Sequence, residues 1–465
     1  MKNNAKNNAK TSKKRKAMPA SLPTTQVDVA GIDIGANEHW VAGPPDGEHA
    51  NVRRFGTTTP DLHELVDWLL EQGVTSTAME STSVYWIPLY ELLESRGIRP
   101  VLVNARHLHN VPGRKTDFLD CQWLQVLHSR GLFRGSFRPG ESIARLRALY
   151  RQQANLVEQR TRFVHWMQKA LDQMNVQVHR AVADLCGKTG MAIVRAIVAG
   201  ERDPARLATH RDARCKKSID EIARCLTGTW REEHIFNLAS ALELYDAVEA
   251  QITAYDQHVL HELEALQPPD RCALPLPPHP NRRKETKIRN RGNQALRTTL
   301  WRLTGVDLTR IDGIAADAAM TIVTEVGTDL AAFPSEHHFA SWLRLCPRTP
   351  ISGGRPLKKR TNAAGANRVA AVLHMAAVAL NRSKTALGAA YRRIARHKGA
   401  GVAVFAMARR LAELIYRMLR FGQDYVDIGE EAYELKYETR RLASIKEAAR
   451  SLGYNLVEQD PMLAT

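Results

Sequence analysis

Between residues 25 and 140, segments in which apolar residues alternate with a period of two, as in strands, are mixed with segments in which they recur every three or four residues, as in helices. Few folds have this order of elements. Three short runs rich in β-branched and apolar residues come first, and helix-type and strand-type patterns then alternate. Strands joined by tight turns form an antiparallel meander, whereas strands separated by helices lie parallel. We therefore predict a mixed α/β domain over residues 25–140, with strands at 27–34, 39–45, 51–58, 75–80 and 100–105 and helices at 60–72, about 84–95 and from about 117.

Strand-type patterns nearly vanish after residue 140. In residues 141–267, apolar residues recur at steps of three, four and seven, which is typical of long helices that pair within one chain or across an oligomer. The predicted fold class is therefore α/β plus all-α. Four further segments are predicted: a disordered basic arm at 1–24, a Pro- and Arg-rich basic linker at 268–304, a mainly helical domain at 305–425 and a C-terminal tail at 426–465.

The charge of the chain indicates its class of partner. The sequence has 66 Lys and Arg residues against 49 Asp and Glu residues, a formal net charge of +17. Positive charge favours polyanionic partners, because binding releases counterions. No apolar run is long enough to span a bilayer, so we expect no membrane partner. The six cysteines have neither a disulfide-type nor a zinc-type spacing, which fits a reducing cytoplasm.

Four acidic residues of the α/β segment are candidates for a metal site. Asp117 and Asp120 stand three apart at the start of a predicted helix, where acids are also common because they complement the helix dipole. Asp33 lies within an apolar strand, and Glu80 closes another strand of the same predicted sheet. If these strands are neighbours, their ends bring Asp33 and Glu80 together, and the helix from Asp117 packs across them. Four converging carboxylates suit Mg²⁺ or Mn²⁺, which can orient a phosphodiester.

Several motifs resemble those of the DEDD transposases of insertion sequences, namely "GIDIG" (31–35), "AMEST" (78–82), "VNARHLHNVPGRKTDFLDCQWLQVLHSRGL" (103–132) and "ISGGRPLKKR" (351–360). The stretch "VPGRKTDFLD" is the most specific of them. The resemblance covers about residues 27–140 and 305–425. It implies a RuvC-like, ribonuclease-H-type N-terminal domain and a serine-bearing C-terminal transposase domain. It places the four acids of the family on Asp33, Glu80, Asp117 and Asp120, and its serine on Ser352.

The resemblance also implies a mechanism and partners. Ser352 would be the nucleophile that forms a phosphoserine link to DNA, with Mg²⁺ (or Mn²⁺) on the acids assisting. A structured guide RNA, or bridge RNA, would pair with donor and target DNA, and the protein would act as a homo-oligomer, a dimer or tetramer, near the nucleoid in the cytoplasm of a prokaryote. Residues expected to contact nucleic acid through their charge are Arg114, Lys115, Arg282, Arg283, Lys284, Arg355, Lys358, Lys359 and Arg360.

Other readings of the same residues stay open. Without the resemblance, the Ser-Gly-Gly stretch at 352–354 indicates a turn. A RuvC-like junction-resolving nuclease would use the four acids and water, and a nucleic-acid-binding scaffold would use the acids only as helix caps. A sugar kinase or actin-like ATPase also begins with a "GIDIG"-type strand, but the later half of this sequence has neither the second phosphate turn nor the adenosine motif of that fold.

Overall fold

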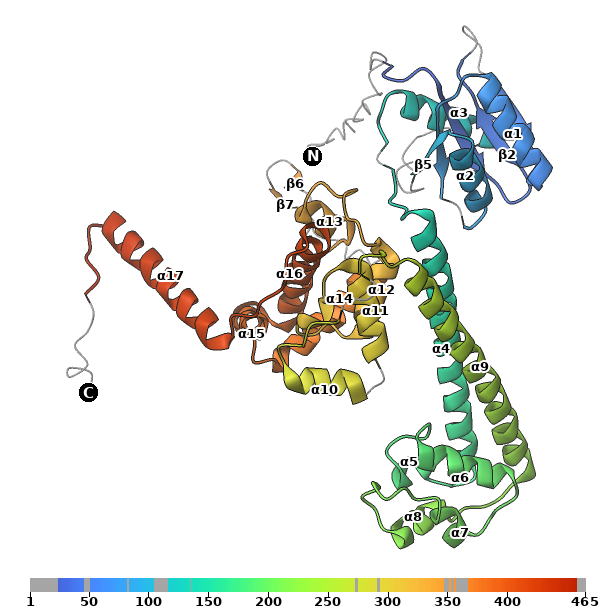
Figure 1. Cartoon of the computed structure of the whole chain (residues 1–465), viewed down its shortest axis with the longest axis vertical. Helices are drawn as coiled ribbons and strands as arrows, with labels where there is room; N and C mark the ends of the chain where they lie inside the picture. The colour runs from blue at the N-terminus through green and yellow to red at the C-terminus, as the bar shows by residue number, and fades with distance from the viewer. Residues whose placement is uncertain are drawn as a thin grey trace, which may run out of the picture. The chain divides into compact units, whose positions relative to one another are not determined.

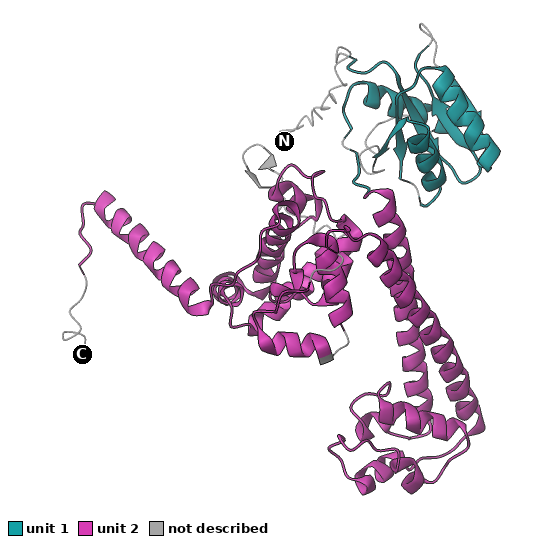
Figure 2. Ribbon diagram, viewed as in Figure 1, with its two compact units in different colours: residues 1–138 teal, residues 139–465 magenta. Residues whose placement is uncertain are grey.

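Figure 1 shows the computed structural model of the chain. It describes residues 24–45, 51–81, 83–103, 116–133, 135–271, 275–290, 293–346, 351–352, 355–356 and 367–457, so the predicted basic arm lies almost entirely outside the described residues. The chain divides into two compact units, residues 1–138 and 139–465 (Figure 2). Among the helices of the described ranges, none is long and apolar enough to cross a membrane.

The first unit contains a five-stranded mixed sheet with the order β3-β2-β1-β4-β5. The strands β1 (Val29–Ile34), β2 (His39–Ala42) and β3 (Val52–Phe55) form the predicted antiparallel meander. The strands β4 (Ser76–Glu80) and β5 (Arg99–Val103) are added in parallel, with β4 directly beside β1. The structure thus confirms the predicted order of elements, and it meets the condition set above that the first and fourth strands are neighbours.

Different helices cover the two faces of this sheet. Because alternate residues of a strand point to opposite faces, Ala30, Ile32 and Ile34 share one face of β1. They form a buried core with α1 (Thr59–Glu71) and α2 (Trp86–Ser95). The opposite face carries Gly31 and Asp33 and packs against α3 (Asp117–Ser129). The two candidate elements, the strand with Asp33 and the helix with Asp117 and Asp120, are therefore in direct contact.

The second unit begins with a long helical hairpin. Helix α4 (Glu141–Gln173) packs along α9 (Glu232–Ala265), and the two run antiparallel. The ion pairs show the direction, since Arg145 near the start of α4 lies 3.7 Å from Glu262, and Arg160 further along lies 2.8 Å from Glu249. The structure pairs these helices within one chain, which is one of the two predicted alternatives.

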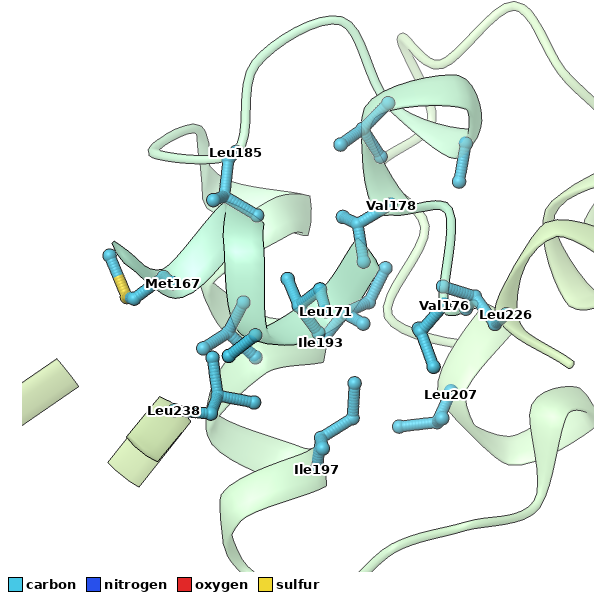
Figure 3. Packing of buried hydrophobic residues seen from close by; sticks show 14 of the residues in the cluster. Met167, Leu171, Val176, Val178, Leu185, Ile193, Ile197, Leu207, Leu226 and Leu238 are labelled. Atoms are coloured by element: carbon cyan, nitrogen blue, oxygen red, sulfur yellow. The ribbon is translucent and has the colours of Figure 1, made fainter. Parts of the chain in front are cut away.

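A small helical cap closes the far end of the hairpin. It consists of α5 (Val178–Ala181), α6 (Lys188–Val198), α7 (Pro204–Ala208) and α8 (Ile219–Leu226). Figure 3 shows its core, in which Leu171 of α4 and Leu238 of α9 lie with Ile193 and Ile197 of α6. The cap therefore ties the two hairpin helices together by burial of apolar side chains.

The remaining chain is almost entirely helical. Its elements are α10 (Arg282–Asn290), α11 (Gln294–Thr304), the 3-10 helix η2 (Leu308–Arg310), α12 (Ala316–Val326), α13 (Glu336–Trp342), the short strands β6 (Ile351–Ser352) and β7 (Arg355–Pro356), α14 (Arg368–Ala379), the 3-10 helix η3 (Leu380–Arg382), α15 (Ala386–Lys398), α16 (Ala400–Phe421) and α17 (Glu430–Ser451). Helix α16 packs against α13, α14 and α15. The fold class predicted from the sequence, α/β followed by all-α, is confirmed.

Two segments are more ordered than their composition indicated. The segment 268–304, predicted as a linker with helical texture resuming at residues 296–303, contains α11 at that place and also α10, which follows the last proline of the segment, Pro280. The segment 426–465, predicted only as a tail, contains the six-turn helix α17. Helix α17 has no buried residue.

Candidate active site

Three of the four predicted acids lie together in the first unit. Carboxylate oxygens of Asp33, Asp117 and Asp120 all lie within 4.8 Å of one another. Asp33 and Asp120 are half-buried, and Asp117 is exposed. We call these three residues the carboxylate group. It joins the carboxyl end of a central strand to the first turn of a helix, so residues more than eighty positions apart in sequence share one small volume.

Gly31 sets the distance between the strand and the helix of this site. A Cβ atom at position 31 would lie 2.3 Å from both the Cys121 carbonyl oxygen and the Gln125 amide nitrogen, and 2.8 Å from Leu124 Cβ. Only glycine permits so close an approach of two backbones. Asp33 follows two residues later on the same face of β1, and it is therefore held against the first turn of α3.

Asp117 and Asp120 begin α3 and belong to the carboxylate group at the same time. Thr116 caps the helix, because its hydroxyl accepts a hydrogen bond of 3.4 Å from the Leu119 amide. Asp117 is the first helical residue, and Asp120 lies one turn later on the same side. Acids in the first turn complement the helix dipole. The structural and the metal-binding interpretations of these two residues are therefore compatible.

Glu80 occupies the equivalent place on the neighbouring strand. It comes one residue after Met79, which pairs with Ile32, so Glu80 is level with Asp33. Ser76 of the same strand contacts His128 of α3 through its hydroxyl, at 2.9 Å, and positions 76, 78 and 80 share that face. Glu80 is half-buried. It faces the same side as Asp33 but is not part of the carboxylate group.

The thiol of Cys121 lies beside the carboxylate group and has a raised pKa. Burial, together with the negative charges of Asp33 and Asp120, raises the pKa of Cys121 to about 12. Both effects disfavour a second negative charge on the helix behind the carboxylate group. Cys121 is therefore a neutral packing residue, and its thiol donates to the Phe118 carbonyl oxygen at 3.2 Å.

The carboxylate group fits a hard divalent cation. Its ligand atoms are all oxygens, which Mg²⁺ and Mn²⁺ prefer. Two oxygens bound to one Mg²⁺ lie roughly 3–4 Å apart, given metal–oxygen distances of about 2.1 Å. The oxygens of the three carboxylates, which lie within 4.8 Å of one another, are close to this spacing. Small side-chain rotations would bring them to the oxygen–oxygen distances found around Mg²⁺.

Comparison with known protein families identifies the chain. A DEDD transposase model of the IS110 type matches residues 30–176, and a model of the IS116/IS110/IS902 transposase family matches residues 306–392. Together they span about half of the 465 residues. The chain belongs to the IS110 family of transposases. A search among curated proteins finds no match. The first match contains all four predicted acids, and the second contains Ser352.

Ser352 lies in the other compact unit of the transposase. It ends β6, which pairs antiparallel with β7 so that Ser352 is opposite Arg355. The residues between these two strands, 353–354, lie outside the described residues, as do the predicted contact residues Arg114, Lys115, Lys358, Lys359 and Arg360. The predicted turn at the serine corresponds in the described backbone to a short β-hairpin.

The three predicted nucleic-acid contacts of α10, Arg282, Arg283 and Lys284, differ in their exposure to solvent. Arg282 and Arg283 are exposed. Lys284 instead donates a hydrogen bond of 2.7 Å to the Ile311 carbonyl oxygen and lies 3.7 Å from an oxygen of Asp312. Burial lowers the pKa of Lys284, and the nearby Asp312 partly offsets this. Lys284 is therefore a structural residue, and the charge offered to solvent comes from its two neighbours.

Sequence reasoning missed two residues that position the site. Gly31 carries a recognisable signal, since a glycine inside an apolar strand often marks a close backbone approach. His128 carries none: it is a buried residue of α3 whose Nε2 lies 2.9 Å from the Ser76 hydroxyl. Burial, together with the positive charge of Arg99, lowers the pKa of His128 to about 4. A neutral His128 thus anchors the C-terminal end of α3 to Ser76 at the start of β4.

Proposed function

We propose that this transposase cuts and rejoins DNA at a divalent cation held by the carboxylate group, with Ser352 as the nucleophile. The observation that carries the proposal is the convergence of Asp33, Asp117 and Asp120 within 4.8 Å. Such acids tolerate one another best when a cation offsets their charge. Membership of a transposase family supports DNA as the substrate.

Each acid has a distinct position in the proposed reaction. Bound Mg²⁺ or Mn²⁺ would draw in the scissile phosphodiester and offset charge that develops on its oxygens. Asp33 is fixed by the central strand, and Asp117 and Asp120 by the capped turn of α3. Glu80, level with Asp33 on β4, would complete the ligand set on the other side. We expect Glu80→Gln to abolish metal-dependent cleavage; full activity of this variant would remove Glu80 from the site.

Ser352 supplies the nucleophilic oxygen in this proposal. The serine oxygen bonds to phosphorus, and the sugar oxygen of the cut strand leaves; a second sugar oxygen later displaces the serine and reseals the strand. Arg355, which pairs with Ser352 in the backbone of β6 and β7, would offset phosphate charge. Because the carboxylate group and Ser352 belong to different compact units, the reaction requires the bound DNA to engage both, from one chain or from two copies.

The proposed partners are donor DNA, target DNA and a structured guide RNA, bound by a homo-oligomer in the prokaryotic cytoplasm near the nucleoid. The support is the net charge of +17 together with the exposed guanidinium groups of Arg282 and Arg283. Extraction of nucleic acid from the purified protein tests the guide. Absence of any discrete RNA, combined with full recombination on DNA alone, would refute it.

A junction-resolving nuclease is the second candidate function. One observation favours it: the carboxylate group is assembled within the first unit alone, without any residue of the unit that contains Ser352. Such an enzyme would use water in place of the serine oxygen.

Covalent trapping separates the two functions. Wild-type protein, Ser352→Ala and Asp117→Asn are incubated with labelled DNA and Mg²⁺, and protein–DNA adducts are separated under denaturing conditions. Of these three proteins, we expect only wild type to form adducts. Ser341→Ala, at an exposed serine of α13, is the matched control and should form them normally. If Ser352→Ala still cleaves DNA in a metal-dependent manner, the nuclease replaces the recombinase.

A further inference from the structure

Two aromatic side chains, Trp40 and Phe118, lie directly beside the carboxylate group. Trp40 of β2 is the register partner of Asp33, so these two side chains share the face of the sheet that α3 covers. Phe118 follows Asp117 in the first turn of α3. The ring centroids of Trp40 and Phe118 are 6.2 Å apart, and the rings meet edge to face at 84°. We call these two residues the aromatic pair.

Phe118 keeps ring surface open to solvent. Its exposed fraction is 42%, and an edge-to-face contact uses a face of only one of the two rings. A single exposed apolar side chain is ordinary on a protein surface. This one adjoins three carboxylates that are proposed to hold a phosphodiester through a cation. A planar apolar surface thus lies where the nucleotide next to the bound phosphate must pass.

The indole ring of Trp40 is held in position by its polar edge. Its Nε1 donates a hydrogen bond of 3.0 Å to one carboxylate oxygen of Glu38, and the other oxygen of Glu38 lies 3.3 Å from a guanidinium nitrogen of Arg54. Arg54 is in turn the register partner of Trp40 on β3. Because Arg54 offsets the charge of Glu38, this arrangement fixes the indole and adds little net negative charge beside a bound phosphate.

We propose that Phe118, supported by Trp40, stacks on an unpaired nucleobase of the DNA strand whose phosphate is bound at the carboxylate group. This inference rests on the proposed function, because the bound phosphodiester is what brings a base to this place. Every base has a π face, so the contact tolerates any sequence. Stacking fixes the nucleotide beside the scissile bond and thereby limits the orientations of its phosphate at the cation. Phe118 is thus a substrate-binding residue, and Trp40 is a positioning residue that acts through it.

Photochemical crosslinking tests the contact on the full-length protein. The probe is a single-stranded DNA of mixed sequence with 5-iodouracil in place of thymine, which crosslinks to aromatic side chains that stack on it. In the presence of Mg²⁺, we expect crosslinks on Phe118, located by mass spectrometry in the tryptic peptide 116–130. A bound probe without crosslinks on Phe118 overturns the proposal. Crosslinks on Phe118 from an iodouracil RNA, but not from the DNA, overturn the assignment to the DNA strand.

Two substitutions at position 118 separate stacking from apolar packing. Phe118→Tyr keeps the ring face, whereas Phe118→Leu keeps an apolar side chain without it. Loss of one base–aromatic stack weakens binding by about fivefold to 150-fold. We therefore expect Phe118→Leu to raise KM for DNA cleavage about tenfold and Phe118→Tyr to keep the wild-type KM. Leu119→Ala, at a 46% exposed residue of the same turn, is the matched control and should also keep it. A wild-type KM in Phe118→Leu contradicts the proposal.

The role of Trp40 has its own pair of variants. Trp40→Ala removes the ring behind Phe118, whereas Trp40→Phe keeps an aromatic edge there. We expect the first to lower the crosslink yield at Phe118 and the second to restore most of it, with folding verified by circular dichroism. A wild-type yield in folded Trp40→Ala removes Trp40 from the proposal.

The affinity for Mn²⁺, measured by calorimetry, distinguishes failure of the stacking from failure of the metal site. We expect wild type and Phe118→Leu to bind Mn²⁺ equally, because the substitution leaves all three acids in place. If both proteins bind Mn²⁺ and cleave DNA with the same KM, the stacking is wrong and the metal site stands. If wild type binds no Mn²⁺ and cleaves no DNA, the proposed function fails, and the stacking that rests on it fails as well.

Discussion

Substitution of Gly31 by alanine tests whether backbone contact between β1 and α3 builds the carboxylate group. The added Cβ would meet two backbone atoms of α3 at 2.3 Å. Ordinary carbon contacts are about 3.5–4 Å, so α3 must withdraw by roughly 1–1.5 Å. Overpacking of this kind costs about 1–3 kcal/mol, which the first unit can survive. The variant is therefore expected to fold with a displaced helix.

We expect Gly31→Ala to lower the rate of DNA cleavage more than it lowers the stability of the fold. Asp117 and Asp120 move with α3, whereas Asp33 stays on β1, so the carboxylate group opens by about the same 1–1.5 Å. A misplacement of 1 Å can lower a rate by about 10²-fold. We expect Gly31→Ala to reduce Mg²⁺-dependent DNA cleavage by about this factor and to weaken Mn²⁺ binding measured by calorimetry.

The control variant is Gly401→Ala in α16, where an added Cβ meets nothing within 4 Å. It should retain activity and unfold at the same or a slightly higher temperature, because alanine favours a helix more than glycine does. Circular dichroism verifies that both variants are folded. Wild-type cleavage and Mn²⁺ affinity in folded Gly31→Ala would refute the claim that this contact sets the geometry of the site.

Three further predictions follow from the same contacts. The pKa of His128 falls from about 6.5 unfolded to about 4 folded, so its contribution to stability is complete above pH 6.5 and is lost as the pH falls towards 4; thermal unfolding of His128→Gln should depend less on pH in this window than wild type does. Mn²⁺ at 100 times its dissociation constant should stabilise wild type by about 2.7 kcal/mol and Asp33→Asn much less, and chelation should reverse the gain; equal gains would place the ion elsewhere. Arg283→Ala should weaken nucleic-acid binding and reduce its salt dependence by about one charge, whereas Lys284→Met should lower the unfolding temperature and leave the salt slope unchanged; the opposite result would reverse the roles of the two residues.

The sheet could be predicted because the sequence patterns that mark its strands and connections lie within short stretches of the chain. Alternation of apolar residues marks each strand, and the length of each connection decides between antiparallel and parallel pairing. The order of the strands brings β1 beside β4, and this neighbourhood alone places Asp33 and Glu80 on one edge. The convergence expected from the sequence was conditional on this neighbourhood and included four acids, of which the structure groups Asp33, Asp117 and Asp120.

The finer geometry could not be predicted because it depends on tertiary contacts. Glu80 stays outside the carboxylate group although it is level with Asp33, and the close backbone approach of α3 at Gly31 is to β1. Lys284 and Arg283 are neighbours of like charge in sequence. The position of the Ile311 carbonyl oxygen decides which of them turns inward. Composition cannot distinguish two such residues.

The candidate chemistry is divided between two parts of this chain. All five candidate catalytic residues lie inside the two segments that match transposase family models. The carboxylate group depends on a backbone contact inside the first unit, whereas Ser352 lies in the second unit. Substitution of the serine should therefore leave the acids in place. If Mn²⁺ binding persists in Ser352→Ala, the metal site is complete without the serine, and the loss of recombination in that variant is the loss of the nucleophile.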